Sequence, residues 1–367
     1  MKFLITGGGT GGHIYPALSI ANEIKERYKN SDILYVGTKE GLESELVPKE
    51  GFKFETIRVE GLPRKLSKES IISSVKLIHG IFDSRKIINK FKPDIIIGTG
   101  GYVSGPVVYV GSKKKIPSII HEQNAFPGIT NKILSRYVTK IAVSFHESEK
   151  YFKYPGKIVF TGNPIRKSII SVNKEEAFKK LNIDPDIPFI LSFGGSGGQK
   201  KLNDAMYWVV KKVASHSDVQ IMHVTGKRFY SDFAANLKKD GIILKNNIKI
   251  LPYFFDMPLG LNTASLVITS GGAIAIAELT ALGIPSIIIP KSYTAENHQV
   301  YNGKAIEKAG AGLLILEKDL TGEKLYESIM KLIKDKNKLY EMSLNSKNIG
   351  RTNAASKIVD IVETILK

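Results

Sequence analysis

Two glycine-rich stretches have the composition of anion-binding loops, and each directly follows a short apolar run. The first reads GGGTGGH over residues 7–13, and the second reads GGSGG over residues 194–198. Glycine lets the backbone come close to a ligand, and the amides that open a following helix face negative charge. In the second stretch the hydroxyl of Ser196 could join these amides in holding a phosphate. A tight turn without a ligand is the alternative at the first stretch.

Two side chains near the predicted strand ends are candidates for accepting a proton. His13 ends the first glycine stretch, and a histidine with an ordinary pKa of ~6.5 could take the proton of an attacking hydroxyl, or it could simply cap the loop. Glu122, in the sequence HEQN at residues 121–124, is the second candidate. Asn124 could bind a sugar hydroxyl, and loop structure alone is the alternative for both. The H-E-x-x-H spacing of a metal site is absent, so we expect no metal.

The second half of the chain carries polar groups suited to a ribose and a sugar. Glu278 falls about two turns into an otherwise apolar helix. A buried carboxylate is costly without a partner, which the vicinal hydroxyls of a ribose or a basic side chain would supply. Gln299 closes the sequence AENHQ after another apolar run, and its amide group suits sugar hydroxyls.

The pattern of apolar runs predicts the scaffold that positions these groups. Predicted strands cover residues 2–6, 33–36, 95–99, 118–121 and 141–143, then 189–193, 220–225, 248–251, 266–269 and 286–289. Short apolar strands separated by amphipathic helices, such as one over residues 16–28, indicate parallel sheets covered on both faces. We therefore expect an α/β protein with two doubly wound domains that face each other across a cleft and bind ligands at the carboxyl ends of their strands.

Composition narrows the class of protein. The chain has 367 residues, no cysteine and a net charge of +18 from 53 basic and 35 acidic side chains. Disulfides and thiolate metal sites are excluded, and we expect neither a signal peptide nor a membrane-spanning helix. The charge suits nucleotides, anionic lipids or nucleic acid, but basic and aromatic residues do not interleave as a nucleic-acid surface requires. An NAD-dependent oxidoreductase would fit the G-x-G-x-x-G pattern at residues 7–12, yet the second predicted strand ends without the acidic residue that holds the ribose.

Taken together, the motifs resemble those of the MurG family of peptidoglycan N-acetylglucosaminyltransferases. The shared motifs, in order along the chain, are GGGTGGH, GGYVSGP, HEQNAFPGITNK, TGNPIR, GGSGG, TSGGAIAIAE and ENHQ. The resemblance implies a GT-B fold and an inverting transfer of N-acetylglucosamine from UDP-GlcNAc to lipid I, giving lipid II without a metal or other cofactor. It places the acceptor on a domain of residues 1–163 and the donor on a domain of residues 164–349, with a helix near 350–367 packing back on the first. A UDP-GlcNAc epimerase or a glycolipid synthase of the same fold is the competing interpretation.

The resemblance also implies which residues bind the donor and which perform the chemistry. The donor-binding residues carried over by position are Thr10, Gly11, Gly12, Asn124, Arg166, Ser196, Phe254, Glu278 and Gln299. His13 is the first candidate for the base and Glu122 the second. Phe254 stands where the family often has isoleucine, and residues 197–199 read Gly-Gly-Gln where Gln-Gly-Ala is usual. Residues 270–272 read Ser-Gly-Gly where many members have an arginine, so Arg166 or helix amides would have to neutralise the diphosphate.

Residues 66–91 have the pattern of a basic amphipathic helix. Ile71, Val75, Ile78 and Phe82 share one predicted face, Leu77, Ile81 and Ile88 widen it, and lysine and arginine residues flank it. Such a helix suits the surface of an anionic membrane, although a helix that covers a sheet also buries an apolar stripe. Because the acceptor is held in the membrane by its lipid, we expect a peripheral protein at the cytoplasmic face that docks through this segment.

Overall fold

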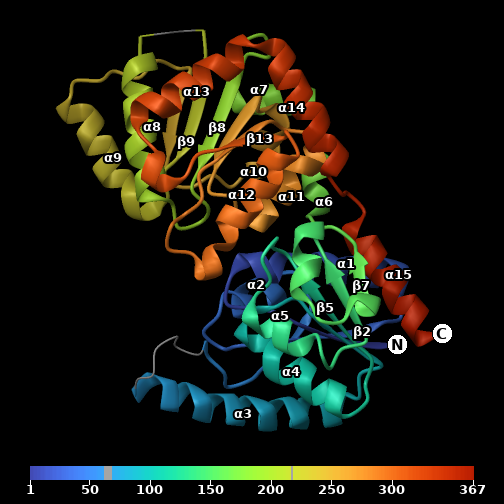
Figure 1. Cartoon of the computed structure of the whole chain (residues 1–367). Helices are drawn as coiled ribbons and strands as arrows, with labels where there is room; N and C mark the ends of the chain where they lie inside the picture. The colour runs from blue at the N-terminus through green and yellow to red at the C-terminus, as the bar shows by residue number, and fades with distance from the viewer. Residues whose placement is uncertain (62–67, 216–217) are drawn as a thin grey trace. The chain divides into compact units, whose positions relative to one another are not determined.

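The computed structural model describes residues 1–61, 68–215 and 218–367. The chain folds into two units, one made of residues 1–166 and 351–367 and the other of residues 167–350. Each unit is built around one parallel β-sheet with helices on both faces (Figure 1). The expected fold class, two Rossmann-like units of parallel sheet, is therefore confirmed.

The sheet of the first unit has the strand order β3-β2-β1-β4-β5-β6-β7. Its strands are β1 (Lys2–Thr6), β2 (Asp32–Gly37), β3 (Lys53–Thr56), β4 (Ile95–Gly98), β5 (Ser118–Glu122), β6 (Lys140–Val143) and β7 (Ile158–Phe160). The chain winds outward in one direction from β1 and in the other from β4, so the topological switch point lies between these two neighbours. Because Thr6 pairs with Gly98, the turns after β1 and β4 leave the sheet side by side.

Helices cover both faces of this sheet. The helices of the first unit are α1 (Gly11–Arg27), α2 (Glu43–Lys49), α3 (Lys68–Phe91), α4 (Gly101–Lys113), α5 (Ile129–Leu134) and α15 (Ala354–Leu366), with short 3-10 turns at His146–Tyr151 and Pro155–Lys157. One apolar core joins α1, α2 and α15 to the sheet, and a second joins α3, α4 and α5 to the opposite face.

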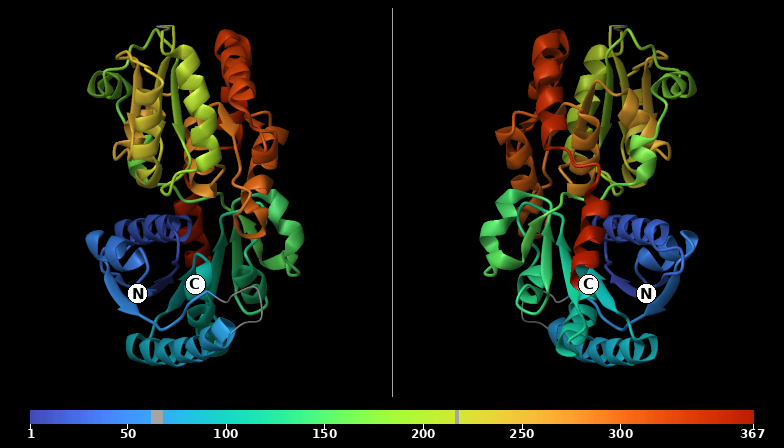
Figure 2. Two further views of the ribbon diagram at one scale, coloured as in Figure 1. Left: turned by 90° about the vertical axis from the view of Figure 1, so that its left-hand side faces the viewer. Right: turned by 90° about the vertical axis from the view of Figure 1, so that its right-hand side faces the viewer.

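The C-terminal helix α15 is part of the first unit although almost two hundred residues separate it from the rest. It lies along α1 (Figures 1 and 2), and Ile358, Val359 and Val362 are fully buried in the shared core. The guanidinium of Arg27 on α1 donates to Asp360 at 2.6 Å and ties the two helices together.

The second unit repeats the arrangement with the strand order β10-β9-β8-β11-β12-β13. Its strands are β8 (Phe189–Phe193), β9 (Gln220–Val224), β10 (Ile248–Leu251), β11 (Leu266–Thr269), β12 (Ser286–Ile288) and β13 (Gly312–Leu314). Here the switch point lies between β8 and β11, where Phe193 pairs with Thr269. The turns over residues 194–199 and 270–272 therefore emerge next to each other.

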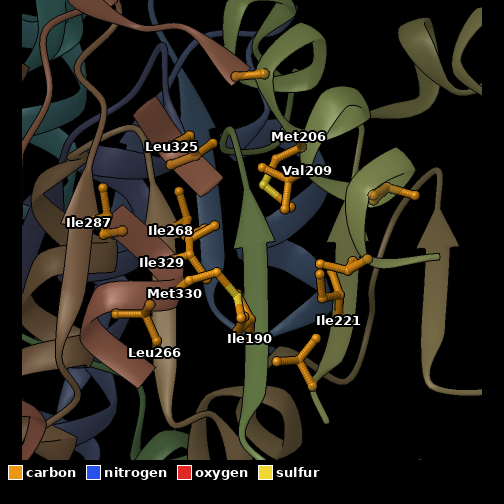
Figure 3. Packing of buried hydrophobic residues seen from close by; sticks show 14 of the residues in the cluster. Ile190, Met206, Val209, Ile221, Leu266, Ile268, Ile287, Leu325, Ile329 and Met330 are labelled. Carbon is orange, nitrogen blue, oxygen red and sulfur yellow. The ribbon is translucent and has the colours of Figure 1, made fainter. Parts of the chain in front are cut away.

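Two apolar cores cover the faces of the second sheet. Its helices are α6 (Lys167–Ile170), α7 (Lys174–Leu181), α8 (Lys200–Val213), α9 (Lys227–Lys239), α10 (Met257–Thr263), α11 (Ala273–Leu282), α12 (His298–Lys308), α13 (Gly322–Lys334) and α14 (Lys336–Ile349), with 3-10 turns at Ala295–Asn297 and Glu317–Asp319. Figure 3 shows the core beneath α8 and α13, where Met206, Val209, Leu325 and Ile329 pack on Ile190 and Ile268.

Several predicted boundaries need correction. Every strand predicted from the sequence is present, but β3, β7 and β13 were not predicted. Helix α1 begins at Gly11 rather than at Pro16, so His13 belongs to its first turn and not to a loop. Residues 66–67 of the predicted amphipathic helix lie outside the described residues. No helix in the described parts of the chain is long and apolar enough to cross a membrane.

Candidate active site

The first glycine turn holds His13 in one defined orientation. Its Nδ1 atom lies 3.0 Å from the carbonyl oxygen of Gly8 and 3.3 Å from the hydroxyl of Thr10. A carbonyl oxygen can only accept, so Nδ1 carries the proton and, in the neutral ring, Nε2 carries the lone pair. The histidine thus presents Nε2 as the basic atom.

The second glycine pair of this unit makes room for that atom. A β-carbon on Gly100 would lie 3.0 Å from Cδ2 and 3.3 Å from Nε2 of His13, closer than ordinary packing allows. Gly100 also has a φ of +99°, which side-chain-bearing residues rarely adopt. The turn after β4 therefore requires glycine both for its backbone and for the space beside the imidazole ring of His13.

Glu122 is at the carboxyl end of β5, fully buried, with both oxygens engaged. One oxygen accepts from the backbone and side-chain amides of Asn124 at 3.0 and 3.2 Å. The other accepts from the amide of Gly128 at 3.1 Å and from Nδ2 of Asn131 at 2.9 Å. Burial raises the pKa of Glu122, and these hydrogen bonds oppose the rise. A carboxylate with this many donors is suited to holding the loop of Asn124 in place, which favours His13 over Glu122 as a base.

The neighbouring His121 is held as a neutral side chain. Its Nε2 donates to the carbonyl of Gly162 at 3.1 Å, and its Nδ1 accepts from the amide of Gln123. Complete burial lowers the pKa of His121 to about 4. No group of histidine and carboxylate side chains in the described residues has the geometry of a metal site.

Glu43 was not predicted, yet its carboxylate fills the back of the first glycine turn. It accepts from the amide of Gly9 at 3.2 Å and from the amide and hydroxyl of Thr38 at 3.0 and 2.7 Å. The side chain of Glu43 is fully buried. The backbone amide of Gly9, which the sequence suggested for binding a ligand anion, therefore binds the carboxyl group of Glu43 instead. The two residues are 34 positions apart, and no local motif signals their contact.

The remaining donor residues predicted in the first unit border the same turns. Thr10 is exposed and is the N-cap residue of α1. Gly11, Gly12 and His13 form the first turn of this helix. Arg166 ends the first segment of the unit and is half-buried, with its guanidinium 5.3 Å from the ring centroid of Tyr15 on α1.

In the second unit, Ser196 occupies an exposed turn between β8 and α8. Gly195 and Gly198 adopt φ values of +79° and +71°. A β-carbon on Gly198 would lie 2.2 Å from the carbonyl oxygen of Thr225, so only glycine fits there. The turn folds tightly on the sheet and leaves Ser196 and Gly197 facing open space.

Glu278 lies on α11, the helix after β11, and Gln299 lies on α12, the helix after β12. Glu278 is 4% exposed on α11, whose N-terminus is the glycine turn over residues 270–272. Gln299, in the first turn of α12, accepts from the backbone amide of Lys291 at 3.0 Å. That bond fixes the orientation of the carboxamide, because the donor must face its oxygen. The NH₂ group of Gln299 is then the donor that remains for a ligand.

Phe254 lies in the segment between β10 and α10. Its ring packs against Gly260, where a β-carbon would come within 2.6 Å of it, and belongs to the periphery of an apolar core. Within the described part of the chain, neither its backbone amide nor its carbonyl has a hydrogen-bond partner. A backbone contact through Phe254 therefore does not depend on the side chain.

Comparison with known proteins agrees with this architecture. Residues 3–143 match the model of the glycosyltransferase family 28 N-terminal domain, and residues 189–364 match that of its C-terminal domain. A UDP-N-acetylglucosamine--N-acetylmuramyl-(pentapeptide) pyrophosphoryl-undecaprenol N-acetylglucosamine transferase of Acetivibrio thermocellus is 48% identical over 367 residues, covering 100% of this chain and 99% of that protein. The protein of the same name from Clostridioides difficile is 51% identical, covering 98% and 88%.

Two solved structures share the fold of this chain. The crystal structure of Acinetobacter baumannii MurG is similar with a TM-score of 0.77 at 25% identity, covering 99% of both chains. A Staphylococcus aureus MnaA–UDP structure shares the fold with a TM-score of 0.72 at 16% identity, covering 100% of this chain and 97% of that one. The chain therefore belongs to glycosyltransferase family 28 and, within it, to the MurG family of N-acetylglucosamine transferases.

Proposed function

We propose that this protein transfers N-acetylglucosamine from UDP-GlcNAc to the 4-hydroxyl of the N-acetylmuramyl sugar of lipid I, giving lipid II, with inversion at the anomeric carbon. The proposal is carried by the sequence identity of 45–51%, along nearly the whole chain, to relatives named as UDP-N-acetylglucosamine--N-acetylmuramyl-(pentapeptide) pyrophosphoryl-undecaprenol N-acetylglucosamine transferases. The orientation of His13 in the first unit and the glycine turns of the second unit support the proposal.

In the proposed reaction, the oxygen of the acceptor hydroxyl attacks C1 of the donor sugar as the bond from C1 to the diphosphate breaks. The proton of the hydroxyl passes to Nε2 of His13, and the bonding electrons leave with UDP. The hydrogen bond from Nδ1 to Gly8 keeps the ring in the tautomer that can accept this proton. Attack from the side opposite the leaving group gives the inverted product.

The second unit is suited to the donor. Glu278 accepts hydrogen bonds from the ribose hydroxyls, the NH₂ group of Gln299 donates to the sugar, and the backbone of Phe254 pairs with the uracil. Ser196 and the amides at the start of α8 meet the diphosphate, since a helix N-terminus favours negative charge. The resemblance to the MurG family also assigns Thr10, Gly11, Gly12, Asn124 and Arg166 to donor binding. None of these contacts requires a metal.

The outer face of α3 is the proposed membrane contact, at the cytoplasmic face of the cell membrane. Ile72, Val75, Ile78 and Phe82 repeat at helical spacing and are 54%, 47%, 54% and 61% exposed. Exposed apolar side chains in a continuous row mark an interaction surface. Exposed Arg85 and Lys86 follow them on the same helix and suit anionic lipid headgroups.

The predicted membrane face of α3 is corrected in part. Leu77 and Ile81 are half-buried against the core and Ile88 is 2% exposed, because they pack toward the sheet. The membrane face is therefore narrower than predicted, and the side chain of Ile71 lies outside what the structure describes.

Product analysis tests the proposed function. Purified protein is given UDP-GlcNAc and a lipid I analogue, and the lipid and nucleotide products are separated. The proposal requires a lipid-linked disaccharide and one UDP for each disaccharide formed. Formation of an epimeric UDP-sugar without any lipid product would instead identify an epimerase of the same fold.

A further inference from the structure

The turn that opens α11 contains no cation. It reads Ser270-Gly271-Gly272 and lies beside the glycine turn that precedes α8. A nucleoside diphosphate brings more negative charge to these turns than backbone dipoles alone neutralise well. The positive charge must then come from a side chain of another element.

Lys291 meets this requirement from the loop that follows β12. A β-carbon on Gly195 would lie 3.9 Å from Nζ of Lys291 and 3.8 Å from the hydroxyl of Ser270. The ammonium group and the hydroxyl are thus within 4 Å of one point above the exposed glycine turn. A phosphate at that point could be reached by both donors.

The loop holds Lys291 in this position through its backbone. The amide of Lys291 donates to Gln299 at 3.0 Å, and the amide of Ser292 donates to Glu317 at 2.9 Å. Gln199, which precedes α8, donates from Nε2 to the carbonyl of Ile289 at 3.0 Å and to Glu317 at 2.8 Å. These bonds connect the lysine loop directly to the glycine turn.

The polar groups at this point make no hydrogen bond or ion pair in the described residues, and Nζ of Lys291 lies 5.9 Å from the ring centroid of Tyr293. In the described residues, no carboxylate lies within ion-pair distance of Nζ of Lys291. Ser270 is 4% exposed, and its hydroxyl has no hydrogen-bond partner in the same part of the chain. Partial burial lowers the pKa of Lys291, and the charge of Glu317 opposes that shift. A half-buried ammonium group beside an unpaired hydroxyl and a glycine turn is an arrangement suited to an anion.

We propose that Lys291 neutralises the diphosphate of the nucleotide and that Ser270 donates to the same group, so that the charge absent from the turn before α11 is supplied by the loop after β12. This assignment rests on the proposed UDP-GlcNAc donor. It makes Lys291 a binding residue that stabilises both the bound donor and the departing UDP.

The test compares Lys291→Gln with Lys291→Arg and with Lys318→Gln. The control removes the same charge from an exposed lysine on the neighbouring 3-10 turn. Each protein is titrated calorimetrically with UDP and with uridine at low and high salt, and its thermal unfolding is recorded. We expect Lys291→Gln to weaken UDP binding about 10- to 100-fold, the loss typical of one charged hydrogen bond. Uridine affinity should be unchanged, and the salt dependence of UDP binding should become shallower.

Lys291→Arg should retain most of the affinity, and Lys318→Gln should behave as the wild type. The assignment is overturned if Lys291→Gln binds UDP as tightly as the wild type, or if it loses UDP and uridine equally together with thermal stability. The latter result would mean that the lysine supports the fold. If the wild-type protein does not bind UDP, the proposed donor is wrong, and the role of Lys291 falls with it.

Discussion

Nδ1 of His13 donates a hydrogen bond to the carbonyl oxygen of Gly8, 3.0 Å away, within a single turn of chain. The bond selects the tautomer and directs Nε2 toward Gly100. The backbone carbonyl group of Gly8 thereby orients His13, the candidate base. This relationship makes the chemistry of the first unit testable with small substitutions.

Replacing His13 with glutamine or alanine should reduce turnover about 100- to 10,000-fold, the usual effect of removing a general base. UDP affinity should hardly change, because the proposed role is in the chemical step alone. Turnover is measured with saturating UDP-GlcNAc and a lipid I analogue. A reduction below about tenfold would show that another group takes the proton.

Gly100→Ala should impair the proposed proton transfer to His13, although residue 100 takes no part in the chemistry itself. Its β-carbon would press on Nε2 of His13, and the φ of +99° would strain the turn. We expect at least a ~10-fold loss of turnover and a loss of stability of about 1–2 kcal/mol. Gly105→Ala is the matched control, because it lies inside α4 with only an ordinary contact 3.7 Å from Thr130. Equal activity of the two variants would argue against a crowded Nε2.

Glu278→Ala tests the ribose contact. A charged hydrogen bond contributes about 1.5–3 kcal/mol, so the dissociation constant of UDP should rise about 10- to 100-fold. Calorimetric titration with UDP provides the measurement, and thermal unfolding shows whether the buried position tolerates alanine. Unchanged affinity in a folded variant would exclude this role.

Ile78→Glu and Phe82→Glu should abolish flotation with anionic vesicles while the protein stays folded. Each places a charge on an apolar surface that should enter the lipid interface. Ile243→Glu is the control, since Ile243 is 86% exposed in the other unit and should not affect flotation. Undiminished binding of the α3 variants, measured beside their thermal unfolding, would place the contact elsewhere.

Acid should destabilise the protein through its buried neutral histidines. Burial lowers the pKa of His121 to about 4 and of His223 to about 3. Between these values and ~6.5 the unfolded chain binds more protons, so the free energy of unfolding falls as the pH falls, by about 1.4 kcal/mol per pH unit for each histidine. The raised pKa of Glu122 acts in the opposite direction, because the native state then takes up the proton first.

Comparison of variants separates these contributions to the pH dependence. His223→Asn should make the decrease shallower by about 1.4 kcal/mol per pH unit. Urea unfolding at pH 7, 6 and 5 gives the slopes. The same slope in wild type and His223→Asn would show that His223 does not titrate as burial requires.

The strands that the sequence predicted are those with continuous apolar runs. The three that were missed, β3, β7 and β13, all lie at sheet edges. None of their residues is fully buried, so their side chains are not constrained to be uniformly apolar. Edge strands of this kind are specified by their pairing partner rather than by their own composition.

In the candidate site, the glycine turns could be predicted, because local spacing determines them, but His13 lies in the first turn of α1 and not in the predicted loop. The contact of Glu43 with Gly9 and the approach of Lys291 to Gly195 could not. Each joins segments that are far apart in the sequence and meet only through sheet order. A lysine after a proline and a glutamate after a turn carry no local sign of such a partner.

The packing of α15 on α1 bears on how the chain folds during synthesis. Protein domains usually fold in the order in which they leave the ribosome. Here the second unit is continuous in sequence and complete at residue 350, whereas the first still lacks Ile358, Val359 and Val362. Its core can close only after residues 354–366 have been synthesised. The unit whose synthesis begins first should therefore be the last to reach its native state.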